Sequence, residues 1–158
     1  MKFLTVLLLV LLSLAIGAFA QTNINLGSAD NFAVLAGSGI TNVSAHTFII
    51  GDVGSSPTPA VTGITQSQVR GILYLTPDPA TVQAQTDLTG AYVEAVNAPC
   101  TTDLTGQDLG GLTLGPGVYC FSSSAQLTGN LTLDAHGNTK AQWIFQMGST
   151  LTTASVPV

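Results

Sequence analysis

The ionisable side chains of this chain are few, and none is spaced for catalysis. Eight acidic residues are scattered over 158 positions, and the single glutamate, Glu94, lies in a stretch with helical periodicity. Enzymes built on parallel β-structure that cleave polysaccharides need paired carboxylates, or acidic calcium ligands beside a basic residue. Arg70 has no such partner nearby in the sequence, and His46 and His136 stand alone in turn-like segments. The sequence therefore predicts no enzyme activity, no metal site and no bound cofactor.

The residue type that recurs at a regular place is threonine. Three stretches, 32–41, 118–128 and 143–152, each read as an apolar strand, a corner of small residues, and an apolar residue followed by threonine. Side chains alternate between the two faces of a strand, so these threonines point outward if their apolar neighbours point inward. The outward set comprises Thr41, Thr128, Thr150 and Thr152, and a similar pattern in 130–135 adds Thr132.

Stacked threonines form a surface with specific physical properties. A β-branched side chain has few χ1 states, so its methyl and hydroxyl groups are held in fixed positions. Strands stack about 4.8 Å apart, which is close to repeat distances on the surface of ice. A level, uncharged patch of this kind can hold water in an ice-like arrangement. Because threonine is common on any exposed strand, an ordinary solvent-facing sheet is the alternative.

The alternation of strands and corners predicts a β-solenoid. A strand, a corner, a second strand, a corner and a third strand make one coil, and residues 47–57 supply a further strand and turn after the first copy. The strands at 32–36, 118–121 and 143–147 are apolar on both sides, as expected for strands covered on both faces. We expect the solenoid core on one side of these strands and a helix on the other.

One segment, 77–99, has the sequence pattern of a helix. Asp78 is an N-cap candidate, Pro79 suits the first turn, and Pro99 ends the helix. Apolar residues recur at steps of three and four, and they are Val82 or Ala84, Leu88, Ala91, Tyr92 and Ala95. The pattern predicts one apolar stripe facing the strands and a polar back.

The N-terminus has the features of an export signal. Residues 1–20 combine Lys2, an apolar run and Ala-Phe-Ala before Gln21, which is typical of a secretory signal peptide; a membrane anchor is the alternative. We expect 21–158 to be one secreted domain with no stable membrane insertion after cleavage. Only 7% of the residues are charged and the net charge is −5, so the chain lacks the basic footprint that nucleic acid requires.

Two cysteines and two glycosylation sequons suit an exported chain. Cys100 and Cys120 favour a disulfide over a metal pair, and two buried free thiols are the alternative. The bridge would close a loop of about 20 residues, worth roughly 3 kcal/mol in the chain-entropy model. The sequons begin at Asn42 and Asn130. In a eukaryote both are glycan acceptor candidates, and sugars there would obstruct the threonine face.

Longer motifs resemble a known family. The stretches NINLGSADNFAVLAGSGITNV (23–43), LGPGVYCF (114–121) and WIFQMGSTLTTAS (143–155) together resemble the DUF3494 family of secreted ice-binding (antifreeze) proteins of microbes. The resemblance covers nearly all of 21–158. It implies an irregular, right-handed, three-sided β-helix with one long α-helix alongside. It also implies that the chain adsorbs to ice and inhibits ice growth and recrystallisation, as a monomer without a cofactor.

The resemblance implies a site on a flat face of the β-helix that the α-helix leaves uncovered. On this chain the matching outward positions are Thr41, Thr128, Thr132, Thr150 and Thr152. The two cysteines match a disulfide of some family members. The family domain normally continues for several coils after LTTAS, so we expect C-terminal coils to be missing after Val158. The alternative function is a secreted, adhesin-like module that uses the same face without affecting ice.

Overall fold

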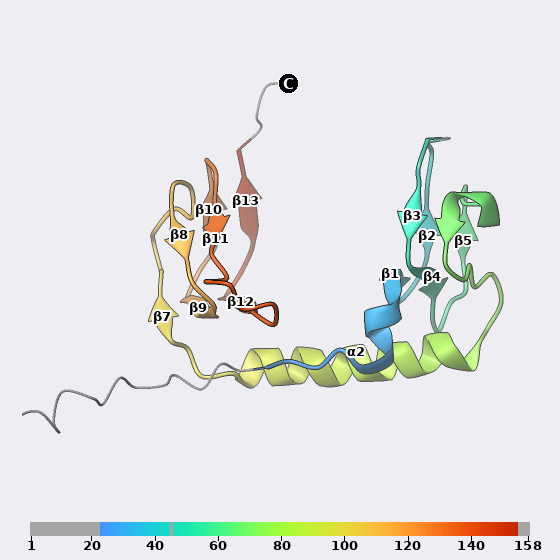
Figure 1. Cartoon of the computed structure of the whole chain (residues 1–158), viewed down its shortest axis with the longest axis horizontal. Coiled ribbons are helices and arrows are strands. Elements are labelled where there is room, and N and C mark those ends of the chain that lie inside the picture. Colours follow the sequence, from blue (N-terminus) through green and yellow to red (C-terminus); the bar gives the residue numbers. More distant parts are fainter. Residues whose placement is uncertain (1–22, 45, 155–158) are drawn as a thin grey trace, which may run out of the picture.

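The fold is mostly β with one α-helix. The structure is a computed structural model that describes residues 23–44 and 46–154, so the predicted signal peptide, 1–20, lies outside the described residues. Every strand pair is parallel. The helix, α2 (Pro79–Asn97), runs alongside the strands (Figure 1). Two short 3-10 helices, η1 (Gly27–Asn31) and η2 (Gln66–Gln68), complete the regular structure.

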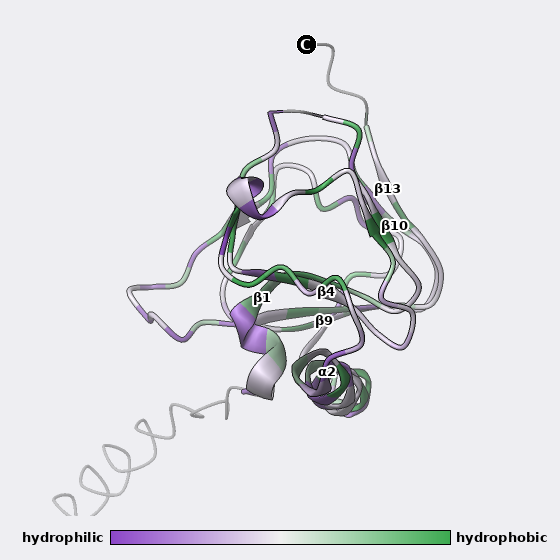
Figure 2. Cartoon of the chain, turned by 90° about the vertical axis from the view of Figure 1, so that its right-hand side faces the viewer, coloured by the Kyte–Doolittle hydropathy of each residue, from purple (hydrophilic) through white to green (hydrophobic). Residues whose placement is uncertain are grey.

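The strands line three walls, which Figure 2 shows as the sides of a triangle viewed along the long axis of the molecule. The helix wall, against α2, holds β1 (Phe32–Ala36), β4 (Asp52–Ser55), β7 (Thr102–Asp103), β9 (Gly117–Phe121) and β12 (Trp143–Met147). The chain then enters the second wall, with β2 (Ile40–Thr41), β5 (Val61–Thr62), β10 (Ala125–Leu127) and β13 (Leu151–Thr153). The third wall follows, with β3 (Ile49–Ile50), β6 (Val69–Arg70), β8 (Thr113–Leu114) and β11 (Thr132–Leu133).

The strand predictions hold for β1, β9 and β12 of the helix wall and are incomplete elsewhere. Strands β1 and β12 have the predicted bounds, and β9 begins one residue earlier than predicted. The segment 47–57 forms two strands, β3 and β4, on different walls, because Gly51 between them has φ +124 and turns the chain. A two-residue strand is too short to show the alternation that marks strands in a sequence.

The strands form two stacks that stand apart along α2 (Figure 1). The N-terminal stack contains β1–β6 and the C-terminal stack contains β7–β13, and no strand pair within the described residues joins them. Each stack has a core of its own: Val53, Ile64 and Val69 in the first, and Leu104, Leu109, Tyr119, Phe121 and Ala125 in the second. The strands that face the space between the stacks, among them β1 and β12, have one unpaired edge.

These open edges expose two leucines that the sequence pattern places inside. Leu151 is paired with the buried Ala125, so both side chains point the same way, yet Leu151 is 48% exposed. Leu133 is paired with Leu114 and is 44% exposed. Both leucines belong to edge strands. Their orientation agrees with the prediction, but no strand on the open side covers them.

Helix α2 begins and ends close to where the sequence predicts. The Asp78 side chain accepts a hydrogen bond from the Ala80 N–H at 2.8 Å, which caps the helix, and Pro79 occupies the first turn. The buried face consists of Thr81, Ala84 and Ala91. Thr81 packs on Gly54 of β4, where the absence of a Cβ leaves room for its methyl group.

The predicted apolar stripe and polar back of the helix are partly wrong. Tyr92 and Val82 are 68% and 54% exposed, and Val93 and Val96 also face solvent. The helix rests on the two stacks with small side chains, so alanines come close to the strands while larger apolar residues lie outside. Periodicity alone does not separate these two faces, because both contain apolar residues.

Side-chain amides tie the helix and the N-terminal segment to both stacks. Gln85 donates to the Ala36 carbonyl of β1 at 2.7 Å. Near the other end of α2, Gln146 of β12 donates to the carbonyls of Ala95 and Ala98, each at 2.8 Å. The backbone of Ile24 exchanges two hydrogen bonds with the Gln142 amide, at 2.7 and 2.8 Å. The helix and the segment before β1 therefore bridge the two stacks.

The predicted disulfide is confirmed. Cys100 and Cys120 are bonded, with their Cα atoms 5.9 Å apart, and the bond links the segment after α2 to β9 in the C-terminal stack. It closes a loop that contains β7 and β8.

We expect the double substitution Cys100→Ser/Cys120→Ser to lower the free energy of unfolding of the C-terminal stack by about 3 kcal/mol, since the unfolded chain regains the entropy of the open loop. The only tryptophan, Trp143, lies in this stack, so its fluorescence in a urea titration is the measurement. The exposed Ser123→Ala is the matched control. An unchanged urea midpoint for the double variant would show that the bridge does not stabilise this stack.

Candidate functional site

Four of the five predicted threonines lie on the second wall, and the fifth does not. Thr41 is in β2 and Thr152 is in β13, while Thr128 directly follows β10 and Thr150 directly precedes β13. All four are exposed. Thr132 is exposed too, but it lies in β11 on the third wall, where it is paired with Thr113 of β8. The structure therefore separates Thr132 from the other four residues.

The residues that lie side by side on neighbouring strands differ from those that the alignment of the internal repeats suggests. Strand pairing places Thr152 beside Gln126, while Thr128 lies two residues further along its strand. The hydroxyl groups of Ser124 and Thr150 lie 3.2 Å apart, in residues separated by 26 positions. The same offset of 26 already holds between β9 and β12, at Val118 and Ile144. The register is carried around the corner unchanged, whereas aligning the Leu-Thr pairs shifts it by two residues.

The structure adds two hydroxyl residues to the second wall that the sequence reading missed. Thr62 of β5 is the direct partner of Thr41, and both are exposed. Ser124 is exposed beside Thr150. A signal for Thr62 was present in the sequence, since it follows Val61 as Thr41 follows Ile40. We call the set Thr41, Thr62, Ser124, Thr128, Thr150 and Thr152 the hydroxyl wall.

One carboxylate stands beside the hydroxyl wall, and the protein satisfies it internally. Asp108 is bridged to Gln126, in the outermost row of the second wall. Its side chain accepts hydrogen bonds from the Thr128 hydroxyl, from the Gly110 N–H at 2.7 Å and from the Thr128 N–H at 3.0 Å. These donors favour the charged form and lower the pKa of Asp108 below its usual range, with the Thr128 hydroxyl as the largest cause. The charge is therefore fixed in place by protein donors.

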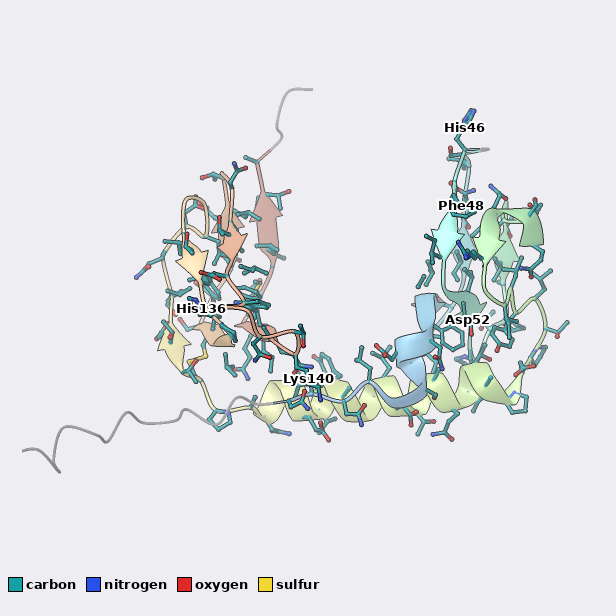
Figure 3. The ribbon with its side chains drawn as sticks, viewed as in Figure 1. His46, Phe48, Asp52, His136 and Lys140 are labelled. Atoms are coloured by element: carbon teal, nitrogen blue, oxygen red, sulfur yellow. A yellow bond between two sulfur atoms is a disulfide. The ribbon has the colours of Figure 1, made fainter. Side chains whose placement is uncertain are left out.

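The other ionisable side chains do not converge on a site. His136 lies 3.2 Å from Asp134 in an exposed turn of the C-terminal stack, while His46 is at a tip of the N-terminal stack (Figure 3). Among residues 23–44 and 46–154, no group of three His, Cys, Asp or Glu side chains is placed to hold a metal ion. A groove between α2 and the sheet of β9 and β12 is lined largely by apolar side chains, and Asp103 is its only carboxylate.

Among the residues that the structure describes, no helix is long and apolar enough to span a bilayer.

The stacked parallel strands, the helix along one wall and the hydroxyl-rich wall that this helix leaves uncovered define a class of β-proteins with stacked parallel strands and one flanking helix. The ice-binding-like family matches residues 34–157, which is most of the chain. The chain belongs to this family.

Individual relatives agree with this assignment. The chain is 51% identical over 130 residues to an ice-binding protein of Nostoc sp. (strain HG1), a match that covers 82% of this chain and 48% of that protein. It is 34% identical to an ice-binding protein of Leucosporidium sp. (strain AY30), with 84% of this chain and 57% of that one covered. The chain thus spans about half the length of these curated relatives.

Solved structures of ice-binding proteins are similar in fold over the part that matches this chain. One from an Antarctic biological consortium superposes with a TM-score of 0.71 at 39% identity, covering 85% of this chain and 60% of that one. A glycosylated ice-binding protein from an Arctic yeast gives a TM-score of 0.73 at 34% identity, covering 84% and 64% of the two chains.

We expect Thr128→Val to raise the pKa of Asp108, because valine keeps the β-branched shape but removes the hydroxyl donor. A titration of the side-chain carboxyl carbon by NMR measures this shift, and Thr132→Val is the matched control. Because the folded-state pKa is lowered, the stabilisation from Asp108 is present above its unfolded-state pKa. It is lost as the pH falls through the folded-state pKa. Equal titration curves for both variants would show that the hydroxyl does not set the pKa.

Proposed function

We propose that this protein binds ice, and that the hydroxyl wall is its ice-contacting surface. Adsorbed protein slows the growth of ice crystals and inhibits recrystallisation. One observation carries the choice of wall: the pairs Thr41–Thr62 and Ser124–Thr150, together with Thr128 and Thr152, lie on a wall that α2 does not cover. Membership of the ice-binding-like family supports the activity.

The physical basis is the arrangement of rigid, uncharged groups on stacked strands. Threonine in a strand has restricted χ1, so its methyl and hydroxyl groups keep fixed positions. Adjacent rows lie about 4.8 Å apart, the spacing of hydrogen-bonded strands. Water held over such rows can adopt an ice-like order before contact with the crystal. The nearest charge, on Asp108, is already engaged by three donors, so it competes weakly for this water.

We further infer that the two stacks belong to one irregular, right-handed β-helix with three sides. In support, the chain visits the helix wall, the second wall and the third wall in the same order in both stacks. Parallel strands joined by crossover connections are right-handed in nearly all known cases. The TM-scores against ice-binding proteins favour the same interpretation.

Secretion is part of the proposal. The pattern of residues 1–20 supports export, and we infer that 21–158 act as a monomeric, non-enzymatic domain once that segment is removed. The partner is the ice surface, with no role for nucleic acid. Nothing in the comparisons favours the alternative of an adhesin-like module.

We expect Thr152→Tyr to weaken inhibition of ice recrystallisation, because a bulky ring prevents the second wall from lying flat on the crystal. The protein concentration needed for half-maximal inhibition should rise at least about tenfold, which corresponds to about 1.4 kcal/mol of lost adsorption free energy. Thr41→Tyr tests the N-terminal stack in the same way. Measurement of crystal size after annealing in frozen sucrose gives the comparison.

Thr132→Tyr on the third wall is the matched control, and we expect it to change the required concentration by no more than about twofold, within ordinary surface variation. Circular dichroism verifies that each variant is folded. If Thr132→Tyr is as damaging as Thr152→Tyr, the second wall is not the contact surface. If the unsubstituted, folded protein leaves crystal growth unchanged, the proposed function is wrong.

A further inference from the structure

We propose that Asn130 is an acceptor site for N-linked glycosylation and that Asn42, which has an equally valid sequon, is not. Both asparagines lie at the same corner of their stacks, where the chain passes from the second wall to the third. In the folded protein their surroundings differ in the freedom of the side-chain amide nitrogen. The inference concerns covalent modification and does not depend on ice binding.

The amide of Asn42 is fully used by the fold. Its Nδ2 donates to the carbonyl of Ser44 at 2.8 Å and to the carbonyl of Gly63, in the next turn of the chain, at 2.9 Å. Its Oδ1 accepts from the Thr47 hydroxyl at 2.8 Å and from the Ser44 N–H at 3.2 Å. All the hydrogen-bonding groups of this half-buried side chain are thus satisfied by the protein.

Glycosylation is incompatible with this set of contacts. In the transfer, Nδ2 bonds to the anomeric carbon of a lipid-linked oligosaccharide, the bond from that carbon to the diphosphate breaks, and Nδ2 releases a proton. The product keeps one N–H, so it cannot donate to both carbonyls. The sugar would also take the place of one of them. One of these carbonyls belongs to Gly63, whose φ of +74 and close approach to the Asn42 backbone leave no room even for a Cβ.

A sugar on Asn42 would therefore push two neighbouring turns apart. The backbone N–H of Asn42 donates to the Thr62 carbonyl at 2.9 Å, next to the Thr41–Thr62 pair. Secreted, folded protein must accordingly have an unmodified Asn42.

Asn130 presents the opposite situation. Asn130 is exposed, and its side chain makes no hydrogen bond to any residue that the structure describes. Its backbone carbonyl accepts a hydrogen bond from the Gly111 N–H at 2.7 Å. The sequon threonine, Thr132, is exposed as well, and Leu131 between them packs on the core of the C-terminal stack. Both sequon groups needed by the transferase are therefore outside, and a sugar on Asn130 breaks no contact within the protein.

The position of Asn130 also accommodates a large substituent. The corner between the second and third walls is opposite the helix wall in Figure 2, so a glycan there lies away from α2. It stands at the margin of the hydroxyl wall, since Asn130 follows Thr128 by two residues. At Asn42 the corresponding corner offers no such space, because the Asn42 side chain is hydrogen-bonded to Gly63.

The test is secretion of the full chain from a yeast host that carries out N-glycosylation. The purified protein is treated with peptide N-glycosidase in ¹⁸O-water, which converts each glycosylated asparagine to labelled aspartate, and its peptides are analysed by mass spectrometry. We expect label at position 130 and none at position 42. Label at 42 in folded protein, or its absence at 130, would overturn the proposal.

Variants give an independent readout on gels. Asn130→Gln and Thr132→Ala should both abolish the mobility shift that the glycosidase removes, whereas Thr132→Ser should retain it. Asn42→Gln should leave the shift unchanged in whatever protein is secreted. A shift that survives Asn130→Gln would place the glycan elsewhere and contradict the assignment. None of these measurements involves ice, so they remain informative even if the proposed function fails.

Discussion

Backbone hydrogen bonding between successive parallel strands determines where the important side chains of this protein lie, and in the C-terminal stack the register of β9 and β12 is the same as that of β10 and β13. The register of β9 and β12 continues through the next corner, where the Gly148 N–H donates to the Phe121 carbonyl and the Ala125 N–H donates to the Thr150 carbonyl, both at 2.9 Å. The second-wall hydroxyls consequently stack without any direct selection of their spacing. Threonine supplies the chemistry, and the ladder supplies the geometry.

Much of the architecture could be predicted from the sequence where a segment is long enough to show a period. The strands β1, β9 and β12 and the helix with its Asp78 cap were recognisable, as was the Cys100–Cys120 pair. The two-residue strands β5 to β8 were not, because they have no period to detect. Thr132 was grouped with the second-wall threonines for the same reason: the bend at Gly129 is visible in the sequence, but two-residue β11 has no period that shows on which wall it lies.

Only some residues of the hydroxyl wall could be predicted from the sequence. Thr41 and Thr152 follow apolar residues within strands, so alternation placed them outside correctly. Thr152 pairs with Gln126, and this pairing follows from the number of residues in the corner between the helix wall and the second wall. Aligning the similar Leu-Thr dipeptides ignores that number. The exposed Tyr92 shows the corresponding limit for the helix, where size decides which apolar residues can approach the strands.

The separation of the two cores has a consequence for how the molecule responds to heat. Val53 and its neighbours form one hydrophobic core and Phe121 with its neighbours another, and the disulfide lies on the side of the second. Cooperative melting requires that loss of one part destabilise the rest, and here that coupling passes through one helix and a few amide clamps. We therefore expect a calorimetric trace of this chain to contain two transitions, which a single melting temperature does not describe.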